Sequence, residues 1–197
     1  MLLEYFLTTT SVLFCGRIGS TEMASAGIAQ SIISILCFMP GYGMVTVCNT
    51  YFSVAFGSKD DRKQCIILQK ALLLSWIVSM LCWAILINTE SILRLLQQKE
   101  EISILAGEFV RVYLPAVPAM FASFVLSRYL QCRNHVMVTM LALLFTAIVN
   151  IILNYVFVIS MNGGTSWSAG SLVISQYVYL IIIIAYTSKY VEWTGRM

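Results

Sequence analysis

Two asparagines are the residues whose type and spacing most clearly suggest chemistry. Asn150 and Asn154 lie in the otherwise apolar segment 148–155, and a spacing of four puts both amides on one face of a helix. At that spacing the two side chains are about 6 Å apart. Since an amide has two donors and an acceptor, the pair can hold a water molecule or orient an ionisable group. The alternative is a structural contact, because asparagine commonly forms hydrogen bonds between helices in a membrane.

Glu4 is the one acidic residue that lies inside an apolar run. A carboxylate within a membrane is a functional hypothesis by default, since it is suited to take up and release a proton. The alternative is that Glu4, only three residues from Met1, extends its side chain to the membrane surface.

Serines recur at helical spacing in two other apolar segments. They are Ser31 and Ser34 in the first segment, and Ser168, Ser171 and Ser175, with Gln176, in the second. Small polar residues usually allow helices to pack closely, and a cavity lining is the second interpretation.

The remaining reactive residues predict neither a catalytic site nor a metal site. The six cysteines form no Cys-x-x-Cys pair, and His135, the only histidine, has no second ligand at a metal-binding spacing. The sequence also has no nucleophile, metalloprotease or nucleotide-binding motif. We therefore expect a protein that is not an enzyme and uses no cofactor.

The composition shows that these residues work in a membrane. Of the 197 residues, 59% are hydrophobic and 11% are charged, whereas a soluble domain has about 25% charged residues. The mean hydropathy is +0.85. The net charge is only +3 and the basic residues are scattered, so no surface for nucleic acid is predicted. The sequence predicts a multi-pass protein of the cell membrane, with the lipid bilayer as a partner.

Charged residues and turns divide the chain into about six transmembrane helices, the first of them truncated. Each crossing needs about 20 apolar residues. The expected spans are at about 1–15, 30–56, 71–89, 109–129, 135–161 and 167–187. Residues 23–29 are expected to form a link or a tilted lead-in to the second span, and residues 89–111 to lie on the membrane surface as an amphipathic segment. The bundle then covers residues 1–188, and residues 189–197 form a short tail.

Three prolines lie inside the expected spans. Pro40 should kink the second span, and Pro115 and Pro118 should bend the fourth, because proline lacks an N–H and frees a carbonyl of the preceding turn. The tyrosines and tryptophans, among them Trp83 and Tyr179, are expected mostly as interface anchors or lipid-facing side chains.

The basic residues predict the orientation of the chain. The loops on one side, together with Lys70 beside them, have eight lysines and arginines, and the loops on the other side have four. The positive-inside rule puts the more basic side in the cytoplasm, and with it both termini.

An ordered series of short segments resembles a known family. The segments are 14–19 (FCGRIG), 22–29 (EMASAGIA), 48–50 (CNT), 55–58 (AFGS), 113–118 (YLPAVP), 129–131 (YLQ) and 150–155 (NIILNY). Together they resemble the multidrug and toxic compound extrusion (MATE) transporters, most closely the animal solute-carrier type. The resemblance covers nearly the whole chain and implies an all-α fold that corresponds to the N-terminal lobe of a two-lobed transporter.

The resemblance also implies a function and its residues. Family members exchange organic cations or drugs for protons or sodium. The resemblance to the animal type favours protons as the coupling ion of this chain. By resemblance, Asn150 and Asn154 fall in the polar cavity of the N-terminal lobe, Cys15 on a cysteine relevant to transport, and Ser34 on a polar position of the second span. The partners would be small organic cations or drugs and the missing C-terminal lobe.

Two alternatives from other classes stay open. The chain could be a transport-inactive membrane protein that binds or modulates a full-length transporter. It could also be a small transporter that completes its pathway with a second copy of itself.

Overall fold

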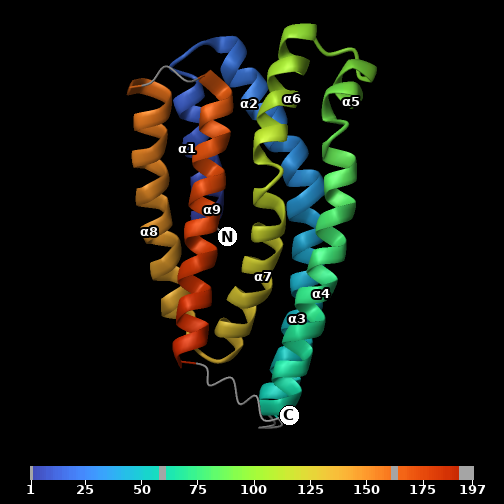
Figure 1. The fold of residues 1–197 in the computed structure, drawn as a ribbon, viewed down its shortest axis with the longest axis vertical. Coiled ribbons are helices and arrows are strands. Elements are labelled where there is room, and N and C mark those ends of the chain that lie inside the picture. Colours follow the sequence, from blue (N-terminus) through green and yellow to red (C-terminus); the bar gives the residue numbers. More distant parts are fainter. Residues whose placement is uncertain (1, 58–60, 161–163, 191–197) are drawn as a thin grey trace.

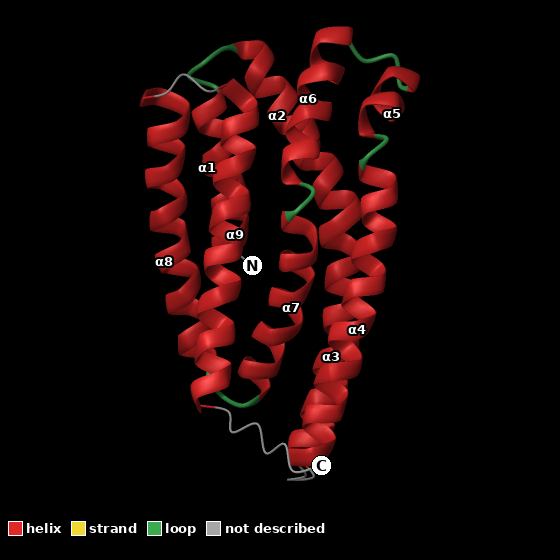
Figure 2. Ribbon diagram, viewed as in Figure 1, coloured by secondary structure: helices red, strands yellow, loops and turns green. Residues whose placement is uncertain are grey.

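The computed structural model describes residues 2–57, 61–160 and 164–190, and every element in these ranges is a helix (Figures 1 and 2). The first elements are α1 (Leu2–Cys15), α2 (Ser20–Ile33), the π-helical turn η1 (Ser34–Phe38), α3 (Met39–Gly57) and α4 (Asp61–Leu86). They are followed by α5 (Thr89–Leu95), α6 (Glu100–Tyr113), α7 (Ala116–Cys132), α8 (Val136–Asn154), the π-helical turn η2 (Tyr155–Ser160) and α9 (Gly164–Tyr190).

Four helices of the described chain are long and apolar enough to cross a membrane, namely Ser20–Gly57, Arg62–Leu86, Val136–Val158 and Gly164–Lys189. The pair α6 and α7 makes a fifth crossing if it is one span bent by 54°. A shorter apolar helix, Phe6–Cys15, precedes them. The predicted all-α membrane bundle is therefore confirmed.

Some boundaries differ from the sequence prediction. The second span begins at Ser20 and continues as one helix of 38 residues, so residues 23–29 are a helical lead-in to this span and not a separate link. The last helix continues to Tyr190, past the predicted start of the tail at residue 189. Residues 191–197 lie outside the described residues.

The segment 89–111 was also predicted wrongly as a single surface piece. It contains the short helix α5 and most of α6, and α6 buries Ser103, Ala106 and Val110 against α2 and α9. The charges at both ends of α6 concealed this packing face, whose small side chains let neighbouring helices approach closely.

The helices stand side by side, and the break between α6 and α7 lies midway along the bundle (Figures 1 and 2). The turn between α1 and α2, the start of α9, and α5 lie at one end of the bundle. The end of α3, the turn between α7 and α8, and the end of α9 lie at the other. Helix α7 lies near the centre and is buried on nearly all sides, in contact with α3, α4 and α9.

Candidate functional site

A buried hydrogen-bond network joins α1, α8 and α9. Asn150 and Asn154 on α8 are both fully buried, with 0% exposure. Nδ2 of Asn154 lies 3.2 Å from Oδ1 of Asn150 and 3.1 Å from Oγ of Ser11 on α1. The two asparagines therefore face each other, as their spacing predicted, and also contact a helix that lies 143 residues away in sequence.

Serines of α9 complete this network. The single hydroxyl hydrogen of Ser168 has two acceptors within reach, Oδ1 of Asn154 at 2.9 Å and the carbonyl of Ser11 at 3.3 Å, and the shorter bond is to Asn154. Nδ2 of Asn150 donates to Oγ of Ser175 at 3.1 Å, and Ser175 donates in turn to the carbonyl of Ser171 at 2.7 Å. Both amide oxygens thus accept hydrogen bonds, so the site is a neutral and well-satisfied polar network in an apolar bundle.

A narrow cavity lies beside the network, between α1, η1, α6, α7, α8 and α9. Its polar lining comes from Thr8, Ser123, Ser175, Gln176 and Tyr179, and Ser175 also belongs to the network. The centre of a water molecule can reach about 30 Å³ of this space. Since one water needs about 10–15 Å³ by this measure, the cavity has room for about two waters and not for an organic cation.

Polar contacts between α7 and α9 close one wall of this cavity. Nε2 of Gln176 donates to Oγ of Ser123 at 2.9 Å, and the hydroxyls of Ser127 and Tyr179 are 2.9 Å apart. Tyr179 is only 4% exposed, so its prediction as an interface anchor was wrong. Its hydroxyl forms a hydrogen bond with Ser127 inside the bundle.

The other predicted residues have different positions. Cys15 is fully buried at the end of α1 and its thiol neighbours the Ser168 hydroxyl, so it lies next to the network. Ser34 is half-buried in η1 and does not line the cavity. Glu4 is in α1, but its side chain lies outside the described residues. By helical register, position 4 is on the same face of α1 as Thr8, Ser11 and Cys15.

Pro40 lies two residues after the π-helical turn η1, within one continuous apolar helix from Ser20 to Gly57. Proline has no N–H for the carbonyl four residues earlier, which is that of Leu36. The thiol of Cys82 on α4 donates to this carbonyl oxygen at a distance of 3.1 Å. The freed backbone group is thus satisfied by a neighbouring helix, as an irregular turn inside a membrane requires.

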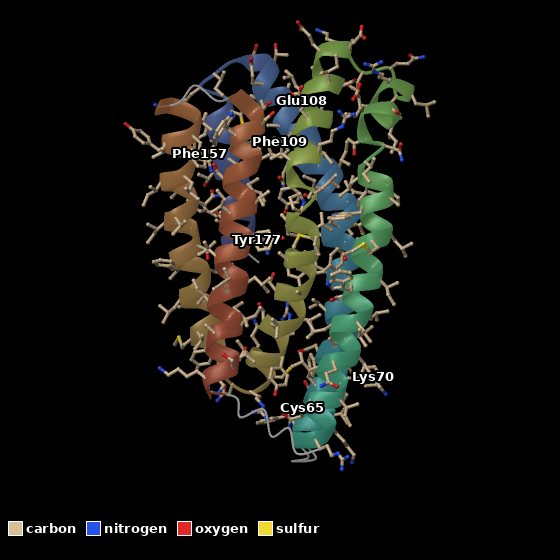
Figure 3. All side chains as sticks on the ribbon, in the orientation of Figure 1. Cys65, Lys70, Glu108, Phe109, Phe157 and Tyr177 are labelled. Carbon is tan, nitrogen blue, oxygen red and sulfur yellow. The ribbon has the colours of Figure 1, made fainter. Side chains whose placement is uncertain are left out.

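The 54° bend between α6 and α7 falls at Leu114 and Pro115. The carbonyl of Leu114, to which Pro118 has no N–H to offer, accepts from the N–H of Val117 at 3.1 Å and from Nε1 of Trp83 at 2.6 Å. The hydroxyl of Tyr177 on α9 donates to the carbonyl of Pro115 at 3.0 Å, and Figure 3 labels Tyr177 on that helix. Trp83 and Tyr177 hold the bend in place, a role that sequence reasoning missed.

The part of the chain that the structure describes has no group of three or more histidine, cysteine or acidic side chains placed to hold a metal ion. The chemistry available at the site is hydrogen bonding by neutral amides and hydroxyls, next to space for water.

The apolar helices, the bend between α6 and α7 and the buried polar network define a multi-pass helical membrane bundle. The MatE family model matches residues 1–156, more than half of the sequence. The chain therefore belongs to the MatE family, and the resemblance found in the sequence is confirmed.

Comparison with curated proteins agrees with this assignment. The chain is 32% identical to multidrug and toxin extrusion protein 1 of Danio rerio, over 94% of this chain and 31% of that protein. It is 34% identical to the Xenopus tropicalis protein 1, over 94% of this chain and 32% of that protein. It is 31% identical to multidrug and toxin extrusion protein 2 of Pongo abelii, over 98% of this chain and 34% of that protein. The chain thus spans about a third of the length of these relatives.

Solved structures show the same fold. The crystal structure of the eukaryotic MATE transporter AtDTX14 matches with a TM-score of 0.89 at 19% identity, over 94% of this chain and 41% of that chain. An inward-facing multidrug resistance MATE family transporter of the MOP superfamily matches with a TM-score of 0.85 at 19% identity. The match covers 92% of this chain and 41% of that chain. The fold is that of one lobe of a MATE transporter.

Proposed function

We propose that the chain provides one lobe of an exporter that exchanges organic cations or drugs for protons, and that it is not an enzyme. The observation that carries this proposal is the buried network of Asn150 and Asn154 with serines of α1 and α9, beside a water-sized cavity. The printed names of the relatives, multidrug and toxin extrusion proteins, support the substrate class.

The network supports protons over sodium as the coupling ion. Each amide oxygen already accepts a hydrogen bond, so a sodium ion would find only one remaining lone pair on each of them. A proton moves along hydroxyls and ordered water without displacing these hydrogen bonds. Asparagine and serine do not themselves hold the proton, and Glu4, on the face of α1 that carries Thr8 and Ser11, is the candidate carrier.

In this mechanism the network senses the proton and does not bind the drug. A change of charge on α1 would alter the hydrogen bonds that hold α1 against α8 and α9. Rearrangement of these contacts would then favour one of two arrangements of the lobe relative to its partner lobe. The organic cation would bind between the lobes, since the cavity inside this bundle holds only about two waters.

The test is uptake of radiolabelled tetraethylammonium, driven by a proton gradient, into vesicles with the protein expressed from its complete transcript. Asn150→Ala and Asn154→Ala should lower the uptake rate several-fold at equal protein levels. Asn88→Ala, which removes an exposed amide that bonds only to the carbonyl of Ala84 four residues earlier, is the matched control. Wild-type rates in both network variants would contradict the proposal.

Glu4→Gln tests the proton carrier separately. It should abolish the response of uptake to the pH gradient, whereas Glu108→Gln, at an exposed position of α6, should preserve it. Equal responses in the two variants would show that Glu4 is not the proton carrier. The role of the network would still be tested by Asn150→Ala and Asn154→Ala.

The one-lobe size favours a second candidate role, since the chain matches only 31–34% of the length of these relatives. A lobe can pair with a full-length homologue and modulate it, or pair with a second copy to complete a pathway. Co-purification with a tagged full-length homologue, and altered uptake on co-expression, would support modulation. A crosslinked homodimer with cation-dependent proton flux would support the second arrangement.

A further inference from the structure

We infer that the groove between α3 and α4 binds an anionic phospholipid near the more basic end of the bundle. The groove has a volume of about 350 Å³. Its floor is made by the buried small side chains of Cys48 and Ala71. Its walls include Tyr51, Lys70 and Leu74, and Figure 3 shows Lys70 on the outer side of α4.

Lys70 lies at the depth of a lipid headgroup. The sixteen residues of α4 beyond it, 71–86, include no charged residue. At 1.5 Å per residue they extend about 24 Å, most of the roughly 30 Å of hydrocarbon in a bilayer. The turns before Lys70 carry Arg62 and Lys63 and reach into the headgroup region. An ammonium group at this boundary is within reach of lipid phosphates.

Lys70 and Tyr51 leave their polar groups available to a ligand. Among the described residues, neither the ammonium of Lys70 nor the hydroxyl of Tyr51 has a hydrogen-bond or ion-pair partner. Tyr51 is 60% exposed, and its hydroxyl can donate to a phosphate oxygen. The two groups line the same groove and offer a phosphate one positive charge and a hydroxyl donor.

The rest of the groove suits an acyl chain. Val47 and Leu74 are 54% and 50% exposed and stand over the small side chains of the floor. One lipid can therefore place its phosphate at Lys70 and an acyl chain along this apolar hollow. A free phosphate ion would use only the polar half of the site.

The charge of this end of the bundle selects an anionic lipid over a zwitterionic one. Six lysines and arginines of the described residues are in or beside the turns of this end, namely Arg62, Lys63, Lys70, Arg128, Arg133 and Lys189. Each basic residue near an anionic membrane surface contributes an attraction that corresponds to about fivefold in affinity. The site is independent of transport, so the inference does not rest on the proposed function.

Native mass spectrometry of the purified full chain in detergent tests the site. When equal amounts of phosphatidylserine and phosphatidylcholine are added, the protein should retain at least about fivefold more phosphatidylserine than phosphatidylcholine. Lys70→Gln should reduce this retention about fivefold. Arg62→Gln removes the same charge from the same helix but outside the groove. This variant should retain much more phosphatidylserine than Lys70→Gln.

Three results would overturn the inference. They are unchanged retention in Lys70→Gln, an equal loss in Arg62→Gln, and equal retention of the two lipids by the wild type. Competition separates a lipid from a free anion, since glycerophosphoserine and inorganic phosphate should not displace the lipid at matched concentration. Displacement by either would assign the site to a free anion. Circular dichroism should show equal helix content, because Lys70 is exposed.

Discussion

Replacing Asn154 by alanine should destabilise the bundle because this side chain connects three helices. Its atoms lie within hydrogen-bonding distance of Ser11, Ser168 and two oxygens of Asn150. Nδ2 has only two hydrogens, so at most two donated bonds and the one accepted from Ser168 form at once. Hydrogen bonds between membrane helices average about 0.6 kcal/mol each, so the loss is about 2 kcal/mol.

A free-energy loss of this size changes the ratio of folded to unfolded protein roughly 20-fold. Unfolding can be driven by raising the SDS fraction in mixed micelles, and a brief pulse of a thiol-reactive dye then reports the unfolded fraction. The dye is informative because Cys15, Cys37, Cys48 and Cys82 are all buried in the folded chain. The midpoint for Asn154→Ala should shift toward lower SDS.

Asn88→Ala is the matched control, since Asn88 is exposed in the turn between α4 and α5 and its side chain donates only to the carbonyl of Ala84, four residues earlier in α4. A double-mutant cycle of Asn154→Ala with Ser168→Ala should give a coupling energy of about 0.6 kcal/mol, and up to about 1.7 kcal/mol. If Asn154→Ala is no more destabilising than Asn88→Ala, the network does not hold α1 to α8 and α9, and the reasoning fails.

Three further predictions follow from close contacts elsewhere in the bundle. Gly41→Ala should cost about 1–3 kcal/mol, because a Cβ at that position would approach a buried phenylalanine ring to 2.9 Å. Gly43→Ala, with nothing within 4 Å, should be neutral or stabilising, and equal midpoints for the two would contradict this packing. Cys82→Ala should cost about 0.6 kcal/mol, and less when combined with Pro40→Ala, which restores an N–H to the preceding turn; an unchanged cost in the double variant would refute the assignment. Arg111→Gln should cost at most about 1 kcal/mol, and a loss that persists in 1 M salt would show that the ion pair with α5 is not its cause.

The asparagine pair could be predicted from the sequence because a spacing of four determines which residues share a helical face. The partners of the pair could not. Ser11 and Ser168 are single hydroxyls in apolar runs, and nothing in their local spacing distinguishes a network serine from a packing serine. Only the arrangement of α1, α8 and α9 brings them to Asn154.

The aromatic residues show a second limit of sequence reasoning. Tryptophan and tyrosine suit both the membrane interface and any buried site where their polar atom finds a partner. Trp83 donates to a carbonyl on a helix 31 residues away, and Tyr179 contacts a hydroxyl 52 residues away. These partners follow from tertiary contacts, so the statistical preference for the interface gave the wrong position for Tyr179.

Helix α4 contacts the chain at both proline sites, and this limits how the lobe can move. Cys82 bonds the carbonyl of Leu36, four residues before Pro40, and the adjacent Trp83 bonds the carbonyl of Leu114 at the bend between α6 and α7. The carbonyl of Leu114 also accepts from the N–H of Val117 at 3.1 Å, so Trp83 adds a second donor there. In an apolar bundle the loss of a hydrogen bond to a backbone carbonyl is costly. If one site moves away from α4, its carbonyl loses the donor from α4, whereas a movement that carries α4 along disturbs the donor at the other site. The two proline sites are therefore expected to move together, with α4 as the element that couples them.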